Sequence, residues 1–383
     1  MTHHVRLKVM TIVGTRPELI KLSRVIAELE RCFDHVLVHT GQNYDDELNR
    51  VFFDDLEIRQ PDYYLEAAGA TAAETIAQVI ARADPVLADE QPDAVLLYGD
   101  TNSCMAAIVA KRRKIPVFHM EAGNRCFDER VPEEINRRIV DHISDINMPL
   151  TEHARRYLLA EGIRSETVIK TGSCMQEVLG YYAQKIDASD VLARLSLTER
   201  NYFLISVHRE ENVDTPERLS ALLDALNALA EEYDVPIIFS VHPRTRRRLD
   251  ALAHGEVDAR IRFMKAMGFL DYVQLQKQAR CVISDSGTIA EEGSLLNLPA
   301  VTLRQAHERP EGMDEGTVIM SDVEPERVLQ AVAMALAHFD AQQPAIRQVA
   351  DYNGGRVSLK VARIIQSYTD YVRHTVWRET ALP

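Results

Sequence analysis

The stretch Cys281-Val282-Ile283-Ser284-Asp285-Ser286-Gly287-Thr288-Ile289-Ala290-Glu291-Glu292-Gly293 joins an apolar run, a short polar turn and the start of a helical pattern. We expect residues 281–284 to form a buried strand and residues 289–296 to form a helix. A strand, a tight turn and a helix together make the repeating unit of an α/β domain with a parallel sheet. This stretch therefore predicts the fold class of the region around it.

The polar turn of this stretch has the features of a phosphate site. Ser286, Gly287 and Thr288 fall at the start of the expected helix, where free N–H groups and the helix dipole favour an anion. One turn further on, Glu291 or Glu292 could accept hydrogen bonds from ribose hydroxyls. Phosphate and ribose together indicate a nucleotide. The alternative is an ordinary helix cap with no ligand.

Composition limits the classes of protein that fit. The chain has 383 residues, of which 46% are hydrophobic and 27% charged, as expected for a soluble protein of two domains. A formal net charge of −14 argues against binding to nucleic acid or an anionic membrane. No apolar run approaches the roughly 20 residues of a membrane helix, and no signal peptide is visible before the first strand. Five scattered cysteines without CxxC spacing suggest reduced thiols, so we expect a cytoplasmic protein.

Strands and helices alternate along the chain in two series. The expected strands are 7–13, 35–40, 94–98, 117–120, 202–207, 236–241, 260–264, 281–284 and 300–303. The expected helices are 17–30, 70–89, 103–113, 216–233, 272–278, 289–296 and 357–372. Continuous apolar strands between amphipathic helices predict parallel sheets covered on both faces. We therefore expect an α/β protein with two doubly wound, Rossmann-like domains that face a cleft. Their expected bounds are 1–172 and 173–356, and a helix in 357–383 packs back on the first domain.

In the first domain, charged side chains follow the expected strands. Arg16 and Lys21 begin the helix after the first strand, and Asp100 and Glu121 follow two later strands. Glu133 begins another helix. Because carboxyl ends of parallel strands meet at one edge, we expect the three carboxylates to converge and to supply an acid and a base. Taken singly, these residues also fit solvated helix starts and caps.

Arg137 lies four residues after Glu133, so the two share a face of that helix. Their other interpretation is a surface ion pair that contributes about 0.3–0.5 kcal/mol.

In the second domain, His208 and His242 follow two neighbouring strands. They could bind a metal, but no third ligand has matching spacing, so phosphate or proton contacts are expected. Tyr272 could stack on a base or pack in the core, and Arg309 could bind a phosphate, a sugar hydroxyl or only solvent.

Eight motifs in this order resemble the non-hydrolysing UDP-N-acetylglucosamine 2-epimerase family over nearly the whole chain: GTRPE, GDT, EAG, PEEINR, HRE, HPR, DSG and ERPE. The resemblance implies the GT-B fold of nucleotide-sugar glycosyltransferases, usually as a homodimer. It also implies inversion at C2 of a UDP-bound amino sugar. The C2 proton is not acidic, so the family eliminates UDP to a glycal and re-adds it after the proton returns on the other face. No cofactor and no metal are required.

The resemblance assigns roles to particular side chains. The groups implied to be catalytic are Asp100, Glu121, Glu133 and His208. The groups implied to bind the substrate are Arg16, Lys21, Gln42, Arg137, His242, Tyr272, Ser286, Gly287, Thr288, Glu292 and Arg309. Which carboxylate takes the proton from which face stays open.

The chain departs from the common members of the family in two places. The segment Asn124–Val131 is shorter and more charged, as in relatives that act on modified sugars such as UDP-N-acetyl-L-fucosamine precursors or diacetamido uronic acids. The segment is expected to border the sugar ring, through side chains that include Arg125 and Arg130. After Gln42 the allosteric pattern of those members is absent. The sugar is thus open, and a UDP-sugar glycosyltransferase or a two-domain sugar-binding protein remain alternatives.

Overall fold

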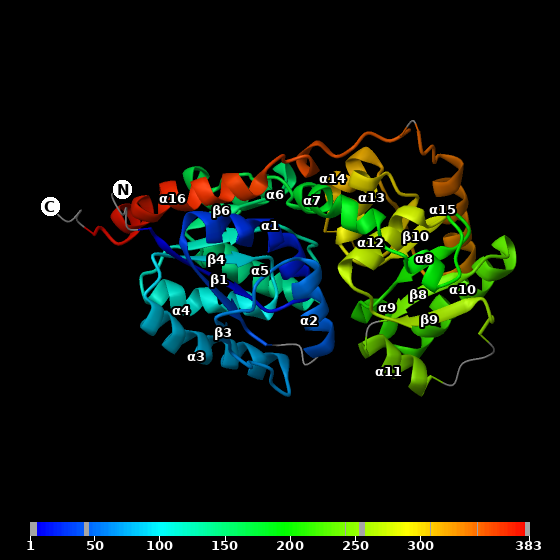
Figure 1. Ribbon diagram of the computed structural model, residues 1–383, viewed down its shortest axis with the longest axis horizontal. Helices are drawn as coiled ribbons and strands as arrows, with labels where there is room; N and C mark the ends of the chain where they lie inside the picture. The colour runs from blue at the N-terminus through cyan, green and yellow to red at the C-terminus, as the bar shows by residue number, and fades with distance from the viewer. Residues whose placement is uncertain are drawn as a thin grey trace. The chain divides into compact units, whose positions relative to one another are not determined.

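The computed structural model describes residues 6–41, 46–241, 243–252, 257–306, 308–342 and 344–379. They form two compact units (Figure 1). The first contains residues up to Leu179 and from Asp351 onward, and the second spans Gly180–Ala350. Of the expected site residues, Gln42 and His242 lie outside the described part of the chain. Within that part, no helix is both long and apolar enough to cross a bilayer.

The first unit is built on a six-stranded parallel sheet in the order β3-β2-β1-β4-β5-β6. Its strands are β1 (Lys8–Val13), β2 (Asp34–His39), β3 (Tyr63–Tyr64), β4 (Ala94–Tyr98), β5 (Val117–Met120) and β6 (Ile146–Met148). The central strands are buried and almost wholly apolar, because helices cover both faces of the sheet. This strand order is that of a Rossmann fold.

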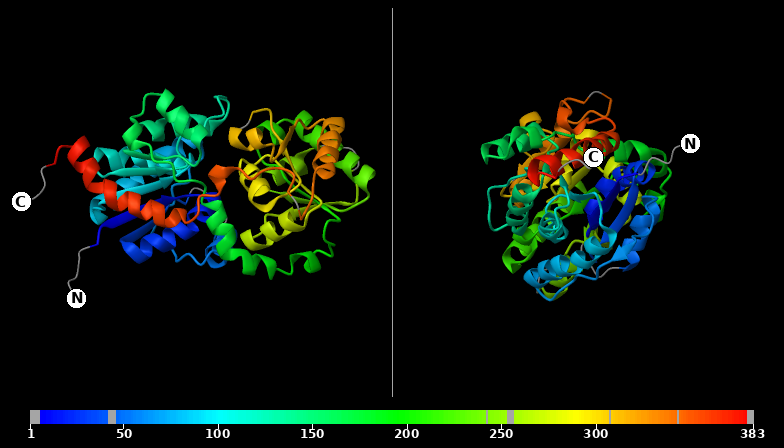
Figure 2. Two further views of the ribbon diagram at one scale, coloured as in Figure 1. Left: turned by 90° about the horizontal axis from the view of Figure 1, so that it is seen from above. Right: turned by 90° about the vertical axis from the view of Figure 1, so that its left-hand side faces the viewer.

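The helices of the first unit alternate with these strands. They are α1 (Arg16–Cys32), α2 (Asp46–Asp55), α3 (Ala72–Glu90), α4 (Ala107–Arg112), α5 (Pro132–Ile143), α6 (Glu152–Ala160) and α16 (Val357–Val376), with short 3-10 turns at Asn102–Ala106, Ser165–Thr167 and Ala350–Tyr352. Helix α7 (Met175–Asp187) leads into the second unit. Helix α16, drawn in orange to red, packs against α1 and so returns the chain to the first unit (Figures 1 and 2).

The second unit repeats the same topology, with a six-stranded parallel sheet in the order β12-β11-β10-β7-β8-β9. Its strands are β7 (Phe203–Ser206), β8 (Ile237–Val241), β9 (Ile261–Lys265), β10 (Cys281–Ser284), β11 (Ala300–Leu303) and β12 (Ile319–Ser321). Its helices are α8 (Val191–Arg194), α9 (Glu210–Val213), α10 (Pro216–Tyr233), α11 (Pro243–Ala251), α12 (Phe269–Gln278), α13 (Thr288–Leu296), α14 (Pro310–Glu315) and α15 (Pro325–Ala337).

The predicted α/β class with two Rossmann-like sheets is confirmed. One predicted element is wrong in detail, because the expected helix 103–113 begins as a 3-10 turn and becomes α-helical at Ala107. The hydroxyls of Thr101 and Ser103 both bind the buried Glu18, and this shared partner holds the turn tight. The short edge strands β3, β6 and β12 are also present, although the sequence pattern did not predict them.

Each sheet has a switch point, where consecutive crossovers leave in opposite directions. In the first unit it lies between β1 and β4, and in the second between β7 and β10. Ligands of doubly wound sheets bind beyond the carboxyl ends of such strands. The motifs GTRPE and GDT follow the first pair of strands, and HRE and DSG follow the second pair.

Candidate active site

Glu121 follows β5 and has an unusual backbone conformation. Its backbone φ angle is +61°, a value that residues other than glycine rarely adopt. Its carboxylate accepts hydrogen bonds from Lys21 Nζ at 2.6 Å and from the Tyr98 hydroxyl at 2.8 Å. The side chains of Lys21 and Glu121 are only 6% and 10% exposed, so the pair is largely shielded from water. A cation and a hydroxyl thus hold one carboxylate at the switch point.

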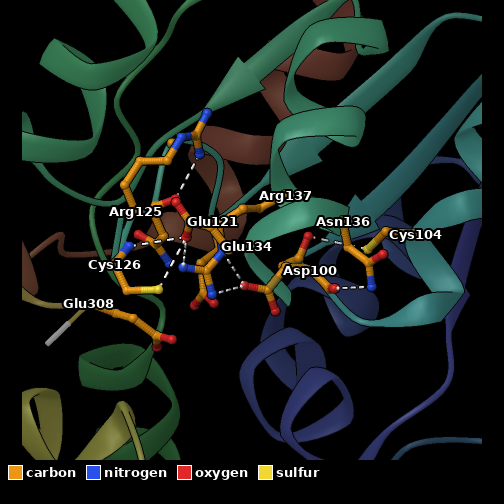
Figure 3. A network of polar contacts seen from close by, with 12 residues as sticks. Asp100, Cys104, Glu121, Arg125, Cys126, Glu134, Asn136, Arg137 and Glu308 are labelled. Atoms are coloured by element: carbon orange, nitrogen blue, oxygen red, sulfur yellow. Dashed lines mark hydrogen bonds and ion pairs between the residues drawn. The ribbon is translucent and has the colours of Figure 1, made fainter. Parts of the chain in front are cut away.

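Asp100 follows β4 and belongs to a second group. The Arg137 guanidinium reaches Asp100 Oδ2 at 2.6 Å and also donates to Glu134 at 3.0 Å (Figure 3). Asn136 donates to the carbonyl of Asp100 at 3.0 Å. Helix α5 therefore fixes both the backbone and the side chain of Asp100.

The buried thiol of Cys104 lies near both groups, where it donates to the carbonyls of Tyr98 and Gly99. Burial, together with the nearby negative charges of Glu18, Asp100 and Glu121, raises the pKa of Cys104. Two of the three expected carboxylates, Asp100 and Glu121, therefore lie close together. An ideal Cβ at Gly99 would also lie 3.5 Å from the Glu121 carboxylate.

The structure places the remaining expected residues of the first unit at the starts of two helices, Arg16 on α1 and Glu133 on α5. Glu133 is half-buried on α5, and its neighbour Glu134 is the residue that joins the Arg137 contacts. The Arg16 guanidinium lies 5.5 Å from the centre of the Phe52 ring, at the start of α1.

In the second unit, the fully buried Asp285 organises the loop after β7. Its carboxylate accepts the backbone N–H groups of His208 at 3.0 Å and Arg209 at 2.8 Å. It also lies 3.3 Å from His208 Nδ1 and accepts a bond from Asn212. The His208 side chain is 42% exposed, so its ring remains accessible to a ligand.

The DSG turn leads directly into α13. Ser286, Gly287 and Thr288 are partly exposed, and the Ser286 and Thr288 hydroxyls lie 3.0 Å apart. Helix α13 begins at Thr288 with Gly287 at its N-cap position. A helix start with two hydroxyls suits an anionic ligand.

Arginines paired with buried carboxylates flank this turn. Arg309 reaches Glu291 at 3.3 Å, and Arg209 reaches Glu308 at 3.2 Å. Arg304 also approaches Glu308, at 3.4 Å. The carboxylates hold these guanidinium groups in place. The arginines thus provide local positive charge in a chain whose net charge is negative.

The two residues expected to contact the nucleoside lie on α12 and α13. Glu292 is buried and accepts a 2.6 Å bond from Gln276. Tyr272 is half-buried and packs against the core, and burial together with the nearby negative charge of Glu292 raises the pKa of its hydroxyl.

The segment Asn124–Val131 differs from its expected role. Arg125 is 1% exposed and binds Asp141 and Glu161 at 2.7 and 2.6 Å, so it braces the interior and does not line a sugar site. The charges of Asp128 and Arg130 pair with each other. The sequence pattern predicted that Arg125 borders the sugar ring, whereas burial against two carboxylates removes its side chain from the surface.

The structure adds residues that motif reasoning missed. Glu18 accepts the N–H groups of Gly14 and Thr15, and burial raises its pKa. Its spacing from Thr15, the T-x-x-E of a capping box, was a usable signal. Asp285 and Glu134 could be found in the sequence only through their neighbours, because they adjoin the expected site residues Ser286 and Glu133.

Among the residues that the structure describes, no group of three or more His, Cys, Asp or Glu side chains is placed to hold a metal ion.

Two Rossmann-type sheets, each with polar groups at its switch point, define a protein of the GT-B type, the fold of nucleotide-sugar enzymes. A family model described as UDP-N-acetylglucosamine 2-epimerase matches residues 27–366. The chain belongs to this family, which confirms the resemblance seen in the motifs.

Solved structures and a characterised relative agree. The UDP-N-acetylglucosamine 2-epimerase of Rickettsia bellii superposes with a TM-score of 0.92 at 57% identity, over 98% of this chain and 100% of that chain. The Methanocaldococcus jannaschii enzyme, solved with UDP-GlcNAc and UDP, gives 0.87 at 34% identity, over 94% and 100%. A Pseudomonas aeruginosa UDP-2,3-diacetamido-2,3-dideoxy-D-glucuronate 2-epimerase is 30% identical, over 94% of this chain and 99% of that protein.

Proposed function

We propose that the protein is a non-hydrolysing UDP-N-acetylglucosamine 2-epimerase, which interconverts UDP-GlcNAc and UDP-ManNAc for polysaccharide synthesis. The observation that carries this proposal is the pair of carboxylates at the first switch point, each held by its own cation: Lys21 with Glu121, and Arg137 with Asp100. Family membership supports the same conclusion.

The chemistry is an elimination followed by an addition. The C1–O bond to UDP breaks with its electron pair as a carboxylate takes the C2 proton, which leaves 2-acetamidoglucal and bound UDP. A proton then returns to C2 on the opposite face, and UDP re-adds at C1. This route avoids a free carbanion at a carbon that has no adjacent carbonyl.

We assign acid/base work to residues 1–172. Asp100, Glu121 and Glu133 share proton transfer at C2, and Lys21 and Arg137 support them. Lys21 and Tyr98 both donate to the Glu121 carboxylate, and contacts of this kind favour the charged form of a carboxylate. An ionised carboxylate is the form that can accept the C2 proton.

We assign UDP binding to residues 173–356. Ser286, Gly287 and Thr288 at the start of α13 hold phosphate oxygens, and Arg309 and His208 stabilise the charge that develops on departing UDP. Other contacts in this assignment come from His242 to phosphate, Glu292 to ribose and Tyr272 to the base. From residues 1–172, Arg16 adds a contact to phosphate and Gln42 a contact to the substrate.

Incubation with UDP-GlcNAc in D2O, followed by NMR at C2, tests the proposal. We expect deuterium at C2 of both epimers, with UDP-sugar as the main recovered species. Dialysis against EDTA should leave the activity intact. Epimerised product that keeps its original hydrogen would exclude the elimination route, and transfer to an acceptor without C2 exchange would indicate a glycosyltransferase.

A modified UDP-amino sugar is the alternative substrate. The burial of Arg125 weakens this reading, because it removes one of the charges that distinguished the segment. We therefore expect kcat/KM to be higher for UDP-GlcNAc than for 6-deoxy or 3-acetamido analogues, and a clear preference for an analogue would reverse the assignment.

We further propose a cytoplasmic homodimer. Ile135 and Ile139 lie one turn apart on α5 and are 53% and 39% exposed, which gives this helix an apolar stripe that a second copy could cover. Light scattering of the wild type and of Ile135→Asp should show a dimer and a monomer, respectively.

A further inference from the structure

His119 is a buried residue of β5 to which the proposed chemistry gives no role. The residue is 0% exposed, and both of its ring nitrogens face oxygen atoms. Nε2 lies 2.6 Å from the carbonyl oxygen of Gly99, and Nδ1 lies 2.9 Å from Oδ1 of Asp141 in an ion-pair contact that is not aligned as a hydrogen bond. The ring therefore spans two elements of the first unit.

Both partners of the ring can only accept. A carbonyl oxygen has no proton to give, and an ionised carboxylate has none either. A neutral imidazole would direct a lone pair at one of these oxygens, whereas the imidazolium offers a proton to each. Burial opposes that charge, but the Asp141 carboxylate outweighs it and raises the pKa of His119.

Asp141 extends this connection to the loop that carries Glu121. Its carboxylate accepts the backbone N–H of Gly123 at 3.1 Å and binds Arg125 at 2.7 Å. A larger residue could not replace Gly123 without a shift of the backbone, since a Cβ there would lie 2.4 Å from the carbonyl oxygen of Ala154. The loop after β5 is thus fixed at the residue two positions beyond Glu121.

The other nitrogen of His119 reaches the loop that carries Asp100. Gly99, its partner, is the residue immediately before Asp100 and has a φ of +68°. One imidazole therefore connects the backbone next to Asp100 with the carboxylate that holds the backbone next to Glu121.

We propose that His119 is a positioning residue that sets the Asp100 and Glu121 loops relative to each other, and that it acts through Gly99 on one side and Asp141 on the other. This role rests on the proposed function, because it matters for catalysis only if the two carboxylates exchange protons with one sugar. Proton transfer requires donor and acceptor within about 2.6–3.2 Å, so a small shift of either loop lowers the rate while leaving the UDP contacts of the second unit unchanged.

The first test needs no substrate. In wild-type protein labelled with 15N-histidine, the His119 ring should show both nitrogens protonated at neutral pH, and in Asp141→Asn the ring should become neutral. Amide exchange in His119→Gln should rise about 10-fold in both loops, residues 99–103 and 121–126, because the ring no longer bonds the carbonyl of Gly99 and no longer contacts Asp141, which holds the Gly123 N–H. His374→Gln is the matched control, as His374 is an exposed histidine of the same unit. A neutral wild-type ring, or faster exchange in one loop only, would overturn the proposal.

The second test is kinetic. His119→Gln should lower kcat about 10-fold or more, with the Kd for UDP unchanged, and the double variant with Asp141→Asn should be no slower than the worse single variant. Additive losses, or equal losses in kcat and UDP affinity, would mean a general structural role. If His119→Gln does not fold, two measurements still test the proposal. They are the ring spectrum of the wild type and the kinetics of the double variant, which removes the charges of both His119 and Asp141.

The two proposals fail in different ways. A wild-type protein that does not exchange C2 hydrogen would refute the epimerase assignment, while the ring spectrum and loop exchange would still report on the connection through His119.

Discussion

The carboxyl edges of the two sheets share one topology but carry different polar side chains. At the first edge, two carboxylates form ion pairs: Glu121 with Lys21, and Asp100 with Arg137. At the second edge, hydroxyls at the start of α13 stand beside arginines that are held by Glu291 and Glu308. The strand order places both groups at a switch point, and the side chains alone are the basis for the proposal that one edge moves protons and the other holds phosphates.

A buried carboxylate closes the first loop of both units, but only the second unit keeps a partly exposed helix start beside it. In the first unit, Glu18 accepts the N–H groups of Gly14 and Thr15 after β1, so these donors are not available to an anion. In the second unit, Asp285 performs the same service for the loop after β7, and the start of α13 remains partly exposed. A buried acid therefore closes the first loop of each unit, and a helix start remains for a ligand in the second.

The largest expected effect comes from removing proton transfer at the first edge. Glu121→Gln should lower kcat by a factor of about 10² or more, because the amide cannot accept the C2 proton. UDP binding, measured by calorimetry, should be unchanged, since UDP is assigned to the other edge. Glu129→Gln, a change at an exposed residue, is the control. Near-normal turnover in Glu121→Gln would contradict the assignment of proton transfer to the first edge.

Acid should weaken the first unit before the second. Burial lowers the pKa of His39, at the end of β2, from 6.5 to about 4. The folded state binds this proton less readily than the unfolded state, so the stability is fully present above pH 6.5. It falls by about 3 kcal/mol as the pH drops to about 4. His119 has the opposite sign, because its raised pKa adds stability that is lost only as the pH rises above 6.5.

Peptide-resolved hydrogen exchange at pH 7 and pH 4.5 measures this difference between the units. His39→Gln should remove most of the acid-dependent loss in the first unit. The same loss in wild type and variant would show that another group is responsible.

A smaller effect is expected at the second edge. Replacing both Ser286 and Thr288 by Ala should raise the Kd for UDP about 10-fold, from the loss of two hydroxyl donors to phosphate. Turnover at saturating substrate should change little, as titration calorimetry combined with initial rates can show. Ser367→Ala, on the exposed face of α16, is the control. A large loss of kcat with unchanged Kd would place chemistry at this edge.

The smallest effect on activity is expected within the segment 124–131. Arg130 is 78% exposed and pairs with Asp128, so Arg130→Gln should cost less than about 1 kcal/mol of unfolding free energy and leave kcat/KM unchanged. Arg125→Gln, which takes a buried cation away from Asp141 and Glu161, should cost about 3–5 kcal/mol of unfolding free energy. Chemical denaturation of the two variants gives the comparison, and equal losses would contradict the different burial of these arginines.

Much of the fold could be predicted because it depends on local pattern. Strands such as β4 and β10 and helix α10 begin and end at the expected residues, since apolar runs and Pro or Thr caps mark their bounds. The edge strands β6 and β12 could not be predicted, because three residues carry no readable period. Their pairing with a neighbouring strand defines them.

The candidate site was predictable only at the level of motifs. Asp100, Glu121 and Lys21 lie close together because strand ends converge, a rule that needs no coordinates. The burial of Arg125 was not predictable, because its partners Asp141 and Glu161 lie 16 and 36 residues away along the chain. Long-range pairing of charges leaves no periodic trace in the sequence.

The return of α16 to the first unit has a consequence for synthesis. Helix α16 packs against α1, and Arg373 binds Asp93 while Ser358 binds Glu177. The second unit is one continuous stretch, so it can fold as soon as it has left the ribosome. The first unit begins earlier but must wait for its last helix. The part of the protein that is made first is therefore completed last, because the surface of α1 that α16 covers stays open until the last helix has been made.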